Sequence, residues 1–212
     1  MDELQGIAES VREELSAKDV ARDNAVRQSR ELIRYCAGSI RAIHRRDFDD
    51  ADTKLATIRA FADDMTAGIA DYPDLYHTGY TQDALKEVVE AFATYAIIRG
   101  EPLPTPASLK VNGATYLKGL AEAATELRRF ILDIMRRKEE HSDEAERLLE
   151  WMDAIYDQLI TFDFPDALTY GLRRQTDIVR SVLERTRGDM TQSLRQQRLQ
   201  EALARFEAQV ND

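Results

Sequence analysis

Apolar residues recur every three or four positions along most of the chain, and no stretch alternates apolar and polar residues over a useful length. The first pattern lines one face of a helix, whereas alternation is typical of a half-buried strand. The clearest stripe consists of Val26, Ser29, Leu32, Ile33, Cys36, Ile40 and Ile43. The pattern therefore predicts an all-α protein.

Breaks in this pattern predict where the helices begin and end. Glycine and proline, nine and five residues in all, gather at a few of these breaks, as expected for residues that end helices. Within the pattern, Thr81 and Ser142 are expected to cap helix N-termini and Gly188 to end a helix. The expected helices cover about 2–46, 48–70, 81–99, 115–139, 142–162, 165–188 and 191–212.

These helices with short connections predict a single-domain bundle of about seven long helices. We expect a helical domain over residues 1–190 and an amphipathic helical extension over 191–212. In the extension, apolar residues again stand four, three and four positions apart: Leu199, Leu203, Phe206 and Val210.

Composition narrows the function classes. The chain has 212 residues, 43% hydrophobic and 32% charged, with a net charge of −10, which is typical of a globular protein. A protein that coats duplex nucleic acid through its overall charge is usually basic, so any nucleic-acid contact here requires a local basic patch.

Other features bear on the compartment. The single cysteine, Cys36, excludes an internal disulfide and is expected to be a small core residue. The N-terminus lacks the apolar run of a signal peptide, and no segment has the length of a membrane span. We expect a cytoplasmic protein with no membrane partner.

Two pairs of glutamates stand within one helical turn in otherwise apolar segments. Glu87 and Glu90 are three residues apart, and Glu122 and Glu126 are four apart. Each pair lies opposite the apolar stripe of its helix, so the spacing alone favours solvated carboxylates. If the pairs instead face each other, a cation such as Mg²⁺ or Mn²⁺ must lie between them. A di-iron site of the ferritin type is not expected, because no histidine follows a glutamate by three positions.

Five arginines share one face of the first predicted helix: Arg27, Arg30, Arg34, Arg41 and Arg45. Guanidinium groups spaced in this way can follow a nucleic-acid backbone by binding its phosphates. A solvated face paired with acidic residues explains the pattern equally well. The spacing leaves both interpretations open.

Four segments, in this order, resemble the translin family: SRELIRYCAGSIRAIHR, ALKEVVEAFATYAIIRGEPLPT, YLKGLAEAATELRR and GLRRQTDIVRSVLERTRGD. The resemblance covers roughly residues 20–190 and is closer to the catalytic branch, translin-associated factor X (Trax). It implies a seven-helix fold that assembles into hollow octameric shells and binds single-stranded RNA or DNA. For the Trax branch it also implies metal-dependent cleavage of RNA inside the shell.

The resemblance also assigns site residues. The Glu-x-x-Glu pair of the Trax branch matches Glu87 and Glu90, and its later acidic residue matches Glu122, where Trax members usually carry aspartate. Glu126 matches a further acidic position. The implied catalytic residues are thus Glu87, Glu90 and Glu122, and the implied ligands of Mg²⁺ or Mn²⁺ are these three together with Glu126.

We therefore expect an archaeal or bacterial Trax-like endoribonuclease, a homo-octamer that acts on single-stranded or small structured RNA. Arg30, Arg34, Arg41 and Arg45 are expected to contact the RNA. The main alternative is a non-catalytic, translin-like octamer that holds single-stranded RNA or DNA. A third is a helical scaffold that binds only protein, which would lack an RNA affinity that falls as salt rises.

Overall fold

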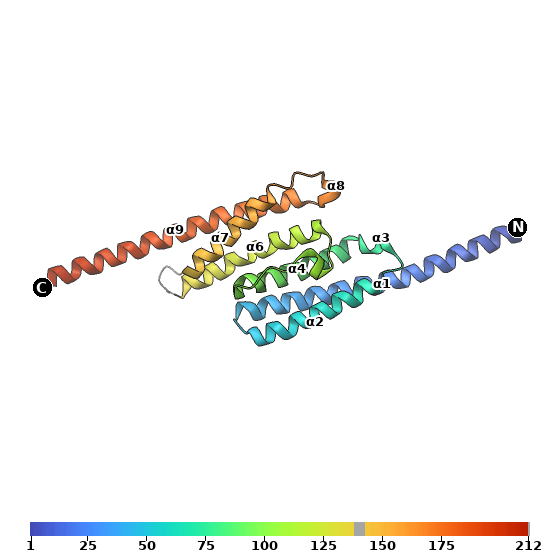
Figure 1. Cartoon of the computed structure of the whole chain (residues 1–212), viewed down its shortest axis with the longest axis horizontal. Coiled ribbons are helices and arrows are strands. Elements are labelled where there is room, and N and C mark those ends of the chain that lie inside the picture. The colour runs from blue at the N-terminus through green and yellow to red at the C-terminus, as the bar shows by residue number, and fades with distance from the viewer. Residues whose placement is uncertain (138–142, 212) are drawn as a thin grey trace. The chain divides into compact units, whose positions relative to one another are not determined.

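The computed structural model describes residues 1–137 and 143–211, and every regular element in these ranges is a helix (Figure 1). The long helices are α1 (Asp2–His44), α2 (Phe48–Ala67), α4 (Gly79–Arg99), α6 (Gly113–Arg136), α7 (Asp143–Leu159) and α9 (Leu172–Asn211). Four-residue helices lie in the connections: α3 (Pro73–Tyr76), α5 (Pro106–Leu109) and α8 (Asp166–Thr169). The all-α prediction is confirmed. None of the described helices is apolar over the length that a membrane span requires.

The chain forms two compact units. The first contains Met1–Tyr95 and Pro104–Gly119, and the second contains Ala96–Leu103 and the residues from Leu120 onward. Two helices, α4 and α6, run without a break from one unit into the other.

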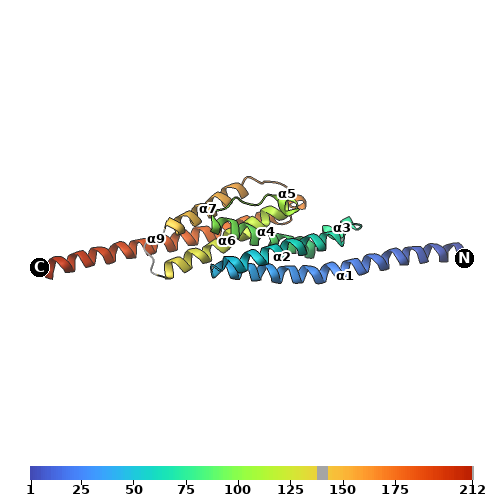
Figure 2. The ribbon, with the colours of Figure 1, turned by 60° about the horizontal axis from the view of Figure 1, so that its bottom comes forward.

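In the first unit α1 and α2 lie side by side (Figures 1 and 2). The Asp47 side chain caps α2 by accepting a hydrogen bond from the Asp50 amide at 3.3 Å. Fully buried apolar side chains from both helices build the core, among them Leu32, Ile43, Ile58 and Met65. Each such side chain contributes about 1.5–3 kcal/mol through its burial.

In the second unit α7 packs against α9. Leu148, Met152 and Leu159 of α7 are buried, as are Val179 and Leu183 of α9. An ion pair between Arg187 and Asp153 also joins the two helices. Helix α7 also carries Trp151, the only tryptophan of the chain.

Helix α4 is buried around most of its circumference. Its middle part buries side chains at nearly every position: Val88, Val89, Glu90, Ala91, Ala93, Thr94, Tyr95, Ala96, Ile97 and Ile98. The solvated position that the spacing alone favoured for Glu90 does not hold, because Glu90 is 8% exposed. A polar residue on such a helix contacts other protein atoms rather than water.

Two predicted helix ends are also wrong. Helix α4 begins at Gly79, so Thr81 is not its N-cap; the Thr81 hydroxyl is buried and donates to the Leu75 carbonyl at 2.9 Å. Gly188 does not end a helix, because α9 continues through it to Asn211. A glycine inside a helix costs only about 1 kcal/mol, which the neighbouring turns can offset. Ser142, the other predicted cap, lies outside the described residues.

Candidate metal centre

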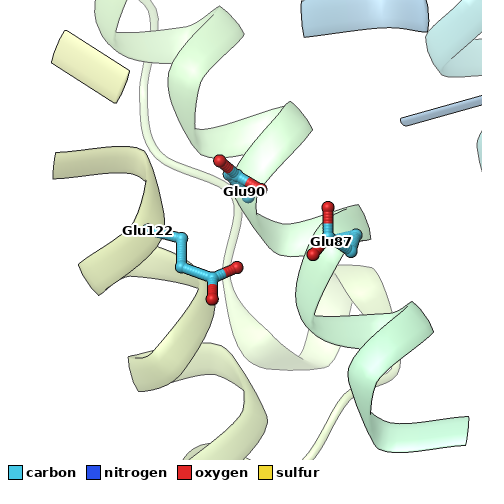
Figure 3. Close-up of side chains that lie close together, drawn as sticks. All are labelled: Glu87, Glu90 and Glu122. Atoms are coloured by element: carbon cyan, nitrogen blue, oxygen red, sulfur yellow. The ribbon is translucent and has the colours of Figure 1, made fainter. Parts of the chain in front are cut away.

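Three of the predicted site residues come together. Glu87 and Glu90 extend from α4, and Glu122 extends toward them from α6 (Figure 3). Each offers one carboxylate oxygen, and these three oxygens lie within 4.8 Å of one another. We call Glu87, Glu90 and Glu122 the acidic triad.

Gly119 explains how α6 comes so near α4. A Cβ atom at Gly119 would lie 2.5 Å from the Val89 Cβ and 2.8 Å from the Lys86 carbonyl oxygen, which are distances that packed atoms do not adopt. Only a glycine allows this approach. Glu122 stands three residues later, about one turn along the same face, so its side chain also faces α4.

A second anchor holds the start of α6 against α4. The Gln82 side-chain oxygen accepts hydrogen bonds from the Asn112 amide at 2.7 Å and from the Thr115 hydroxyl. Because both Asn112 and Thr115 lie at the N-terminal end of α6, this link fixes that helix where it begins. Gly119 then sets the spacing one turn further on.

The acidic triad is partly shielded from water. Glu90 is 8% exposed, and the Glu87 side chain is 24% exposed. Lys86 lies 3.4 Å from a Glu87 oxygen, and the Gln175 amide of α9 donates to a Glu122 oxygen at 3.3 Å. These neighbours orient two of the three carboxylates.

The negative charges of Glu87 and Glu90 act on the thiol of Cys36 in α1. Burial raises the pKa of its thiol above the ordinary value of 9.0, and the charges of Glu87 and Glu90 raise it further. Cys36 is fully buried, which confirms the prediction that it is a core residue. Its neutral thiol lets α1 pack beside two carboxylates without adding a third negative charge.

The donor set of the triad fits a hard divalent cation. Three carboxylates this close repel one another, and a cation among them would remove that repulsion. Oxygen donors alone suit Mg²⁺ and Mn²⁺ better than the softer metals that bind nitrogen and sulfur. Glu122 belongs to the group. The extra methylene that distinguishes it from the aspartate usual in Trax members therefore does not keep its carboxylate away from Glu87 and Glu90.

Other predicted site residues lie elsewhere. Glu126 stands one turn beyond Glu122 on α6 and is half-buried, but it is not part of the group of three. The predicted RNA contacts are all exposed: Arg30, Arg34 and Arg41 on α1, and Arg45 at its C-cap. Arg45 pairs with Asp50 at 3.3 Å, whereas Arg30, Arg34 and Arg41 form no salt bridge with any described residue.

The sequence gives little indication of the supporting residues. Gly119 is recognisable only as a small neighbour of Glu122 on the helical wheel. Gln82 lies outside the four segments that resemble the family, and Gln175 lies in the last of them without an implied role. The importance of each depends on the helix that packs beside it. Such residues are found only once the helices are placed.

The chain is similar to proteins of known sequence and of known structure. No family model matches the chain. The uncharacterized protein MJ0175 of Methanocaldococcus jannaschii is 33% identical over 195 residues, which cover 91% of this chain and 85% of that protein.

Solved structures are similar to this chain as well. The AfC3PO–duplex RNA complex is 33% identical, with a TM-score of 0.80 over 88% of this chain and 95% of that one. AfC3PO by itself is 32% identical, with a TM-score of 0.79 over 88% and 96% of the two chains. Apo-NeC3PO is 20% identical, with a TM-score of 0.78 over 88% and 96%, a likeness that concerns the fold alone.

Proposed function

Since this chain belongs to the translin/Trax family, we propose that it is a metal-dependent endoribonuclease whose reaction centre is the acidic triad. The observation that carries the proposal is the grouping of three carboxylate oxygens within 4.8 Å on two helices. Partial burial adds weight, because Glu90 is 8% exposed and repulsion among carboxylates is screened less where water is scarce.

In this proposal Glu87, Glu90 and Glu122 hold Mg²⁺ or Mn²⁺, and Glu126 supports them from the next turn of α6. When bound, such an ion lowers the pKa of a water molecule and offsets negative charge on a phosphate. The chain itself contributes preorganisation: Gly119 sets the distance between the helices, and Lys86 and Gln175 orient Glu87 and Glu122. Hydrolysis then breaks one P–O ester bond of the RNA and leaves a phosphate monoester and a hydroxyl group.

We propose that the RNA is held by Arg30, Arg34, Arg41 and Arg45. All four are exposed along α1 and its C-cap, and three have no acidic partner among the described residues. Guanidinium groups bind phosphate oxygens in pairs, which suits them to an RNA backbone. The similar AfC3PO is known in complex with duplex RNA, which supports RNA as the ligand of this chain. We propose that the substrate is single-stranded or small structured RNA.

We further propose that the chain works as a homo-octameric shell. Support comes from the large apolar side chains that a single copy leaves exposed, including Ile160, Phe164, Leu168 and Tyr170. Surfaces of this kind are usually buried between subunits.

The direct test is Glu90→Gln, which keeps the shape of the side chain and removes its charge. We expect Mg²⁺- or Mn²⁺-dependent cleavage of a labelled single-stranded RNA to fall by at least about a hundredfold, as when a metal ligand is lost. Glu101→Gln, which changes an exposed glutamate in the loop after α4, is the matched control and should cleave like the parent.

Two results would overturn the proposal. Undiminished cleavage by Glu90→Gln would show that the triad takes no part in the reaction. A parent protein that binds the RNA but cleaves neither single-stranded nor duplex RNA with either metal would be the non-catalytic binding octamer.

A further inference from the structure

Within the first 20 residues of the chain, which we call the N-terminal arm, every residue is exposed except Lys18. Apolar residues nevertheless line one face of the arm at spacings of four, three and four: Leu4, Ala8, Val11 and Leu15. The three larger ones are 48–70% exposed. A helix that only faced water would have no reason to keep such a stripe.

The stripe continues the buried face of the same helix. The alternating spacing of four and three extends through Ala25, Ser29, Leu32, Cys36, Ser39 and Ile43, all of which are buried. Two cations, Lys18 and Arg22, occupy the positions of the stripe between Leu15 and Ala25, and Lys18 pairs with Asp74 at 2.6 Å. The N-terminal arm thus presents a core-type face that the chain itself does not cover.

The end of α9 carries a second exposed stripe. In residues 195–211, the C-terminal arm, Leu199, Leu203 and Phe206 are 53–64% exposed, and Val210 continues the spacing in the sequence. This stripe does not continue the buried face of α9. Leu199 follows the buried Met190 by nine residues, or about two and a half turns, so it lies on the opposite side of the helix. The C-terminal arm therefore offers its stripe to a partner outside its own unit.

The two arms have matching spacing and a different balance of charge. The N-terminal arm has six carboxylates and two cations, and both cations are already engaged, Arg12 with Glu9 and Lys18 with Asp74. In the C-terminal arm three arginines stand beside two glutamates, and Asp212 follows the arm, so its charges nearly balance. Two N-terminal arms side by side would bring twelve carboxylates together, whereas a C-terminal arm beside an N-terminal arm avoids this repulsion and brings three arginines to its carboxylates.

We propose that the N-terminal arm of one copy packs against the C-terminal arm of another copy as a two-stranded coiled coil. The apolar spacing of four and three forms the seam, and the charged residues beside it select the unlike arm. Because each copy has one arm of each kind, two copies can pair both arms reciprocally, or the contact can continue from copy to copy. This inference does not depend on the nuclease proposal.

Disulfide trapping between two copies tests the pairing. The parent has one cysteine, Cys36, which is fully buried and should not cross-link. One tagged protein carries Val11→Cys or Ala8→Cys, and a second, differently tagged protein carries Leu203→Cys or Phe206→Cys. We expect mixed oxidation to give two-chain products that contain both tags, about tenfold faster than controls, because pairing holds the thiols at high effective concentration.

The pattern of products is informative. Fast linkage of position 11 to 203 and of 8 to 206 indicates an antiparallel pair, and linkage of 11 to 206 and of 8 to 203 a parallel pair; either supports the proposal. The matched control pairs Ser10→Cys with Gln200→Cys, both outside the stripes, and should link slowly. Faster linkage of Val11→Cys to itself than to the C-terminal arm, or no linkage above control, would overturn the proposal.

Charge reversal gives a second readout. Glu9→Lys together with Glu13→Lys should slow the mixed linkage at low salt, and added Arg198→Glu in the partner should restore it. High salt should reduce both effects, since exposed charges are screened. Unaltered linkage in the reversed variants at low salt would contradict the role of charge in partner choice.

Discussion

Gly119 is the single position where α4 and α6 permit no side chain. Gly119→Ala would place a Cβ 2.5 Å from the Val89 Cβ and push the helices apart. We expect a loss of about 1–3 kcal/mol in the free energy of unfolding, as for an overpacked core. Mn²⁺ binding should weaken as well, because Glu122 would move away from Glu87 and Glu90. Denaturant unfolding and Mn²⁺ titration measure the two effects.

Gly188→Ala is the matched control, because nothing lies within 4 Å of a Cβ added there. In that position alanine should stabilise α9 by about 0.5–1 kcal/mol through its higher helix propensity. If Gly119→Ala proved as stable as Gly188→Ala and bound Mn²⁺ like the parent, the close approach at Gly119 would not shape the triad.

Cys36 makes stability depend on pH in the alkaline range. Its folded-state pKa is raised above the ordinary value of 9.0 by burial and by Glu87 and Glu90. Above pH 9.0 the unfolded chain loses the thiol proton while the folded protein keeps it, so stability falls as pH rises. This residue should account for a loss of about 1 kcal/mol by pH 10.

Comparison with Cys36→Ala isolates that contribution. The variant starts from a lower stability because it leaves a small cavity, but its stability should fall less between pH 8 and pH 10. The measurement is denaturant unfolding at each pH in the presence of a chelator. Parallel pH profiles of the parent and the variant would show that the thiol does not ionise on unfolding.

At the scale of elements, the helices were largely predictable from the sequence. Repeats of three and four residues are local, and they placed α1 and α2 within a few residues of their observed ends. The ends at Thr81 and Gly188 were wrong because a local preference of about 1 kcal/mol yields to packing against other helices. The connections hold three short helices that are too brief to show a period.

The candidate site was predictable only in part. The spacing of Glu87 and Glu90 places them together on one helix. The same spacing alone favoured a solvated Glu90, because a helical wheel does not show that most of the surface of α4 is buried. The close approach of α6 that brings Glu122 to this pair depends on the absence of a side chain at Gly119, opposite Val89. Such a contact between helices is not visible in the sequence of either helix.

The arginines of α1 act, in our proposal, as one element. Arg34→Gln together with Arg41→Gln removes two charges that have no acidic partner among the described residues. We expect weaker RNA binding and a dependence of log affinity on log salt that is shallower by about 1.4 for a single strand, at about 0.7 per phosphate contact. Fluorescence anisotropy over a salt series measures both.

The control for that pair is Arg180→Gln on α9, where the guanidinium already bonds to Glu184 at 3.0 Å. Its salt slope should equal that of the parent. If the α1 variant kept the parental affinity and slope, RNA would contact another face of the protein.

For the molecule as a whole, the exposed apolar residues predict assembly. Beyond the two arms, Ile160, Phe162, Phe164, Leu168 and Tyr170 lie exposed within eleven residues of one another along the chain. Multi-angle light scattering at micromolar concentration should give a mass several times the 24.2 kDa of one chain. A lone monomer under these conditions would contradict both the shell and the pairing of the arms.

Trp151 gives one of the two compact units an intrinsic optical label. The chain has no other tryptophan, and α7 belongs to the second unit. Emission excited selectively at this indole therefore follows the melting of that unit, whereas far-ultraviolet circular dichroism follows every helix. A lag between the two traces in unmodified protein would reveal stepwise melting, and superimposed traces would reveal a single cooperative transition.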